Sequence, residues 1–143
     1  MIQDGFMTAQ NIIHDQLFLS QKSTSANQAD LKIAEDLRDT LLANKDKAAG
    51  LAANMIGKNK RIIAFYVGPL PLVMLNPQII KRSGEYLTSE GCLSLAGERQ
   101  TKRYKTITVT YQDMDFKTKT QEFSDFIAEV IQHEMDHCEG ILI

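Results

Sequence analysis

Residues 124–140 read SDFIAEVIQHEMDHCEG, and this stretch organises the rest of the fold. Apolar residues such as Ile127 and Ile131 recur there at helical spacing. Ser124 is a favourable N-cap residue, and Gly140 stands where a helix commonly ends. We therefore predict a helix that begins after Ser124 and stops at Gly140.

Two histidines of this helix are spaced so that they can share one metal ion. His133 and His137 are four residues apart, so both side chains leave the same face of the helix about one turn apart. Glu134 is the residue after His133, so its side chain would lie next to such a metal without coordinating it. A base that deprotonates a metal-bound water needs this position. Only one other histidine, His14, is present in the chain. The spacing predicts a metal centre rather than two histidines on a solvated helix face.

The third ligand of this predicted centre has to come from elsewhere, because a catalytic metal usually has three protein ligands and one open position. In long HExxH patterns it is a histidine three residues after the glycine, but here that position is Ile143, where the sequence ends. We therefore expect an upstream ligand, for which Cys92, His14 and several carboxylates compete. Cys92 is the strongest candidate, because a thiolate binds zinc or iron(II) well and its flanks, EGCLS, form a glycine-containing turn. His14 is interpreted as a structural residue, and Cys138, rotated about 100° from its histidine neighbour, as a core residue.

The segment before this helix alternates between strand and turn patterns. Thr106–Tyr111 and Lys117–Phe123 alternate in polarity on either side of an aspartate-rich turn and predict a hairpin. The apolar runs Arg61–Val67 and Leu72–Leu75, the second closed by Pro77, predict short buried strands.

A second helix is predicted near the N-terminus. Ser25 and Gln28 form a capping-box pattern, and apolar residues then recur at helical spacing from Leu31 to about Asn44. Helices at both ends with strands between them imply an α+β fold. Because no linker or repeat interrupts the chain, residues 1–143 are expected to form a single domain.

The composition excludes several classes of protein. Sixteen lysines and arginines against 18 aspartates and glutamates give a net charge of −2, so no direct sequence-specific binding to nucleic acid is expected. The first twenty residues contain no lysine or arginine and no unbroken apolar run, so neither a signal peptide nor a membrane span is expected. Two cysteines do not make a disulfide scaffold. We expect a cytoplasmic protein with reduced cysteines and no membrane partner.

Three blocks of the sequence also match a known pattern in order and spacing. They are AGLAANMIG at Ala49–Gly57, EGCLS at Glu90–Ser94 and QHEMDHCEG at Gln132–Gly140. With these blocks the chain resembles the peptide deformylases, which remove the formyl group from the initiator methionine of nascent bacterial polypeptides. The resemblance implies an α+β, deformylase-like fold, in which short antiparallel sheets pack around a C-terminal metal-bearing helix, together with an N-terminal helix.

The resemblance also implies roles for individual residues. Cys92, His133 and His137 would bind one divalent metal ion, Fe2+ in the first place, with Zn2+, Ni2+ and Co2+ as alternatives. Glu134 would be the general base and acid. The backbone N–H of Leu93 would stabilise negative charge on the formyl oxygen.

Substrate contacts follow from the same resemblance. The partner would be an N-formylmethionyl peptide, which the protein would meet at the ribosome exit. Gly50 would allow the peptide to approach closely, Leu93 would contact the formyl group, and Ile131 would line an apolar pocket for the methionine side chain. Met55 stands in the same substrate-binding segment as Gly50. Arg103 would pair with Asp136 and brace the metal helix, with Glu90 and Gln132 as further supporting groups.

The first block departs from the family pattern. Most members have glycine at Ala48, proline at Asn54 and glutamine at Met55, and Ala96 in the second block replaces a common proline. The glutamine amide donates to the formyl oxygen, which methionine cannot do. In an extended segment, Asn54 would point away from the side of Met55.

Two alternatives to a deformylase remain open at this point. One is a deformylase-like paralogue that binds metal and formylated peptide with little or no turnover, which the methionine at position 55 favours and the intact Glu134 disfavours. The other is a general metallopeptidase, which the cysteine ligand disfavours.

Overall fold

The computed structural model describes residues 9–143, and its central element is one antiparallel sheet of five strands in the order β1-β2-β3-β4-β5. The strands are β1 (Gly50–Ala52), β2 (Ile62–Val67), β3 (Leu70–Gly91), β4 (Glu98–Gln112) and β5 (Thr118–Ser124). The helices are α1 (Gln16–Leu19), α2 (Leu31–Ala43) and α3 (Asp125–Cys138), with short 3₁₀ helices at Gln28–Asp30 and Ala53–Ile56. The predicted α+β class is confirmed, and the strands belong to one strongly bent sheet.

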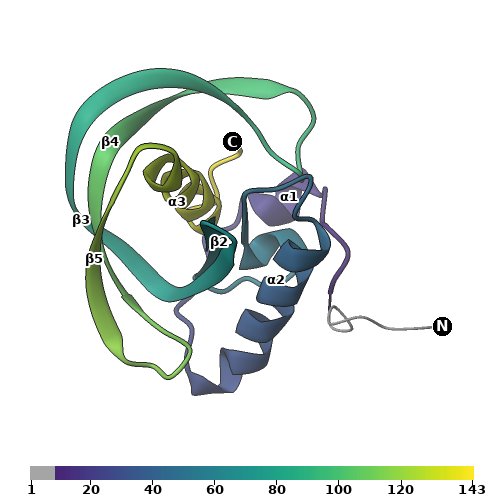
Figure 1. Ribbon diagram of the computed structural model, residues 1–143. Helices are drawn as coiled ribbons and strands as arrows, with labels where there is room; N and C mark the ends of the chain where they lie inside the picture. The colour runs from purple at the N-terminus through teal and green to yellow at the C-terminus, as the bar shows by residue number, and fades with distance from the viewer. Residues whose placement is uncertain (1–8) are drawn as a thin grey trace.

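The C-terminal helix α3 lies inside the curve of this sheet. Figure 1 shows the long strands β3 and β4 arching around it. Ser124 precedes its first residue, as predicted, and Gly140 has a left-handed φ of 75° just after its end. A Cβ atom at Gly140 would lie 2.3 Å from the carbonyl oxygen of Ser20, so only glycine fits there.

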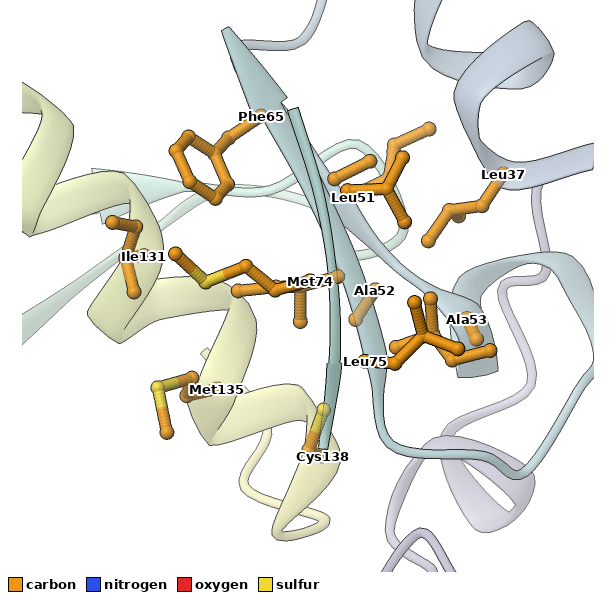
Figure 2. Close-up of a cluster of buried hydrophobic side chains, with 14 of the residues drawn as sticks. Leu37, Leu51, Ala52, Ala53, Phe65, Met74, Leu75, Ile131, Met135 and Cys138 are labelled. Carbon is orange, nitrogen blue, oxygen red and sulfur yellow. The ribbon is translucent and has the colours of Figure 1, made fainter. Parts of the chain in front are cut away.

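The hydrophobic core lies on both faces of the sheet at β1, β2 and the start of β3. Figure 2 shows Ile131, Met135 and Cys138 of α3 on one side of these strands and Leu37 of α2 on the other. Burial on both faces explains why β2 is an unbroken apolar run instead of an alternating one. Helix α3, which carries the two predicted histidine ligands, is therefore packed against the hydrophobic core.

Strand β3 is much longer than predicted. Pro77 does not end it, because the register between β3 and β4 shifts between Leu75 and Gln78. Such a bulge tolerates a residue without a backbone N–H. The part beyond it, Gln78 to Gly91, is mostly exposed and polar, so no hydrophobic pattern marked it in the sequence. It is held by pairing with β4, whose first half, before Thr106, was also not predicted.

The predicted cap of the N-terminal helical segment was misplaced. Asn27, not Ser25, caps it: the Asn27 side chain accepts from the N–H of Ala29, and the Asp30 carboxylate accepts from the N–H of Asn27. The segment then continues through the short 3₁₀ helix into α2. Within residues 9–143 no helix has the length and apolar character needed to cross a membrane.

Candidate metal centre and active site

Three side chains predicted as metal ligands meet between α3 and the turn after β3. One ligand atom each from Cys92, His133 and His137 lie within 4.8 Å of one another. The Cys92 Sγ atom is 3.2 Å from Nε2 of His137, and the two imidazole rings are 5.2 Å apart. Both histidines come from neighbouring turns of α3, whereas Cys92 approaches from the sheet.

The donor set fits a single divalent metal ion. One thiolate and two imidazoles suit zinc and iron(II), and three protein ligands leave a position open for water or substrate. The ring of His133 is already oriented for ligation, because Nδ1 lies 2.7 Å from Oε1 of the buried Glu90, so Nε2 is the nitrogen that can bind a metal. The backbone N–H of Ser94 donates to the Cys92 sulfur at 3.4 Å, which helps to fix the position of that sulfur.

Burial and charge act differently on the two histidines. Burial lowers the pKa of His137 to about 3, with the charge of His133 adding to the effect, so this ring is neutral as a ligand must be. Burial by itself also lowers the pKa of His133, but hydrogen bonds to Cys92 and Glu90 outweigh it and raise this pKa to about 10. A metal ion competes with that proton, so metal binding at this group releases a proton.

Glu134 lies beside this group with one oxygen free. It is 4% exposed, and within residues 9–143 no hydrogen-bonding group reaches its Oε1 atom. Burial raises the pKa of Glu134 to about 7, against the opposing charge of His133. A buried carboxyl group with a free oxygen and a pKa near neutrality is suited to accept a proton and return it.

A cavity of about 420 Å³ opens in front of these groups. Among its lining residues are Cys92, His133, Glu134, Leu93 and Met55. Its size lies within the usual range for ligand sites, and it combines apolar walls with a few converging polar groups. The cavity therefore brings together two of the three predicted ligands, the predicted base and predicted substrate-binding residues, while the third ligand, His137, is fully buried behind its wall.

Gly50 also lines the cavity, but the structure gives an additional reason for a glycine there. A Cβ atom at this position would lie 2.7 Å from Cγ1 of Val130 and 3.1 Å from Cγ of Glu134. The missing side chain is what allows α3 to approach β1 so closely. Gly50 thus helps to set the position of Glu134, apart from any contact with a peptide.

Ile131 does not line the cavity, contrary to the prediction. It is fully buried among core side chains on the sheet side of α3 (Figure 2). It is two positions before His133, which is about 200° around a helix, so the two side chains lie on opposite faces. Val130, about 60° from His133, occupies the cavity wall instead.

The segment that carries Asn54 and Met55 is a 3₁₀ helix. The sequence predicts an extended segment here, and this prediction is wrong. Met55 is 1% exposed, and its sulfur accepts the backbone N–H of Ala52 at 3.3 Å. Asn54 is equally buried and donates from Nδ2 to the carbonyl oxygen of His137 at 2.9 Å. The two neighbouring side chains therefore have separate partners, and only Met55 lines the cavity.

The remaining candidate ligands lie outside the group. His14 bonds through Nδ1 to the carbonyl oxygen of Ser94 at 2.9 Å and is not part of the metal-binding group. Cys138 is 1% exposed in the core, and burial raises its pKa to about 12, so its thiol is unreactive. Both residues match their predicted structural interpretation.

A buried ion-pair network contacts the proposed ligand His133 through Glu90. Arg103 donates from Nε and Nη2 to the Glu90 carboxylate at 2.9 and 2.7 Å and from Nη1 to Asp136 at 2.7 Å. Burial alone would raise the pKa of Glu90, but hydrogen bonds from His133 and Arg103 outweigh it and lower this pKa to about 2. Glu90 is therefore a carboxylate that connects Arg103 to the ring of His133.

Comparison with known proteins gives a consistent result. The family model described as polypeptide deformylase matches residues 10–143. A peptide deformylase of Clostridium beijerinckii is 55% identical over 132 residues, which are 92% of this chain and 97% of that protein. One of Dictyoglomus thermophilum is 40% identical over 87% of this chain and 83% of its own length.

Solved structures show the same similarity in three dimensions. A Met-Ala-Ser-bound class I type b peptide deformylase from Acinetobacter baumannii superposes with a TM-score of 0.83 at 26% identity, covering 94% of this chain and 96% of the other. The peptide deformylase of Thermotoga maritima gives a TM-score of 0.83 at 27% identity, covering 94% of each chain.

Proposed function

Because the chain belongs to the polypeptide deformylase family, we propose that it hydrolyses the formyl amide of N-formylmethionyl peptides and releases formate. The observation that carries this proposal is the free, buried oxygen of Glu134 beside the Cys92, His133 and His137 group. Substrate binding alone does not need a buried base, so the alternative of a paralogue without turnover is not favoured.

The proposed reaction uses Glu134 twice. Cys92, His133 and His137 would hold a divalent ion, which when bound would lower the pKa of a water and polarise the formyl oxygen. Glu134 accepts the proton of the attacking water as oxygen bonds to the formyl carbon. It then returns this proton to the leaving amine as the carbon–nitrogen bond breaks. The backbone N–H of Leu93, at the cavity wall, stabilises the charge on the formyl oxygen.

The finer assignments are part of the proposal. Fe2+ is the first choice of metal on the family resemblance, and the thiolate and imidazole donors equally suit Zn2+, Ni2+ and Co2+. We place the protein in the cytoplasm, where nascent formylated peptides leave the ribosome exit, and treat residues 1–143 as one domain. Gly50, Met55 and Leu93 line the cavity and are the residues that we propose contact the peptide.

Formate release from formyl-Met-Ala-Ser tests this function. The protein is purified without oxygen, stripped with a chelator and reloaded separately with Fe2+, Zn2+, Ni2+ and Co2+. We expect formate release that is lost on stripping and restored by at least one ion, most strongly by Fe2+. Release no faster than that of a Glu134→Ala variant would contradict the proposal.

Met55→Gln tests the role of the unusual residue at the cavity wall. The Gln amide can accept the Ala52 N–H that the Met55 sulfur now accepts and can still donate to the formyl oxygen. We expect kcat/KM to rise by about tenfold, less than the 10²- to 10³-fold that loss of such a donor usually costs. An unchanged or lower kcat/KM would show that the cavity is adapted to methionine.

A further inference from the structure

The metal-bearing helix ends immediately after one of its proposed ligands. His137 is the last residue but one of α3, which stops at Cys138. The final carbonyl groups of a helix have no partner within it, and helix ends tend to fray. A ligand at this position needs support from outside the helix.

The two histidines receive this support in different ways. Nδ1 of His133 bonds to Glu90, which fixes its ring. His137 is fully buried, and no group within residues 9–143 hydrogen-bonds to its Nδ1 atom. Apart from the contact of its Nε2 atom with the Cys92 sulfur at 3.2 Å, its ring therefore depends on packing and on the position of its own backbone.

That backbone is held by a side chain distant in the sequence. Nδ2 of Asn54 donates to the carbonyl oxygen of His137 at 2.9 Å, and the backbone N–H of Gly140 donates to the same oxygen at 3.0 Å. The bond from Asn54 is buried and joins residues 83 positions apart. A hydrogen bond shielded from water is stronger than an exposed one, and it competes with no solvent.

The same asparagine belongs to the turn that forms a wall of the cavity. Met55, its neighbour, lines the cavity and is itself fixed by the Ala52 N–H. The Asn54 amide therefore ties this wall to the last turn of α3, and both sit against the core (Figure 2).

We propose that Asn54 is a positioning residue of the metal centre, which holds the backbone of His137 so that its Nε2 atom faces Cys92. The inference rests on the proposed role of His137 as a ligand. It concerns a residue that touches neither metal nor substrate.

The test measures metal binding directly. Asn54→Leu keeps most of the side-chain volume and removes the donor. Co2+ affinity is measured by competition with a chelator, the Co2+ absorption spectrum is recorded, and unfolding by urea gives the stability of the stripped protein. We expect a Kd for Co2+ roughly tenfold higher, as for other residues that orient metal ligands, and an altered spectrum.

Matched controls separate positioning from general damage. Asn76 is also an amide that bridges segments, donating to Ala26 and Gln112. Asn76→Ala should lower stability and leave the Kd and spectrum of the folded protein unchanged. Asn54→Ala serves as the second variant if the leucine does not fold. A wild-type Kd and spectrum in the folded Asn54 variant, or an equal weakening by Asn76→Ala, would overturn the proposal.

The ligand assignment is tested separately. His137→Ala should lose most Co2+ affinity; unchanged affinity would overturn the ligand assignment and the role of Asn54 with it. A wild type that binds Co2+ but releases no formate would contradict the proposed function alone, and the Asn54 comparison would still decide the positioning role.

Discussion

Glu134→Gln is expected to lower kcat/KM for formyl-Met-Ala-Ser by roughly 10²- to 10⁴-fold, the usual contribution of a general base. Glutamine has the same shape but cannot accept a proton from water. Since Glu134 is not one of the three proposed ligands, the Kd for Co2+ should stay close to the wild-type value. The two measurements together separate loss of the base from loss of the metal.

Another acidic residue on the same helix provides the control. Asp125 is the exposed first residue of α3 and does not line the cavity. Asp125→Asn removes one negative charge from the same helix and should change kcat/KM by less than about threefold. If the two variants lost activity equally, the effect would be one of charge, and the proposed base would be wrong.

The part of the site on one helix could be predicted from sequence because its geometry is local. A spacing of four residues fixes His133 and His137 on one face of α3, and Gly140, with its left-handed φ, marks where that helix ends. Cys92 could be proposed only from its chemistry and the family resemblance, since no local rule states which turn of the sheet approaches a helix.

Other features depend on tertiary packing and left no pattern in the sequence. The distal half of β3 is exposed and polar, and only its pairing with β4 holds it in place. Asn54 looked like a residue of an extended segment, because nothing near it shows that the end of α3 packs against it. Ile131 is different, because helical geometry alone places it opposite His133, and Val130 could have been chosen from the sequence.

The ion pairs of Arg103 serve both the stability of the fold and the metal centre. Its side chain is 4% exposed and lies between the Glu90 and Asp136 carboxylates, each 2.7 Å from one of its terminal nitrogens. Removing one member of a buried ion pair leaves a charge without water or partner, at a cost of about 3–5 kcal/mol. Here Glu90 would lose its arginine partner and keep its contact with His133, whose ring it orients, and the quarter-exposed Asp136 would lose its ion pair.

Arg103→Leu should therefore lower the free energy of unfolding of the stripped protein by about 3–5 kcal/mol. For a chain of this size that corresponds to a Tm lower by roughly 10–20 °C.

Lys102→Leu is the matched control, because Lys102 is the neighbouring residue of β4 and its pair with Glu85, at 3.7 Å, is more than half exposed. Exposed pairs contribute at most about 1 kcal/mol, so this variant should stay close to wild type. Arg103→Lys keeps the charge but not the two parallel hydrogen bonds to Glu90. Its free energy of unfolding should therefore lie between those of Arg103→Leu and Lys102→Leu. If Arg103→Leu were no less stable than Lys102→Leu, the network would contribute nothing to folding, and its role would be limited to orienting His133.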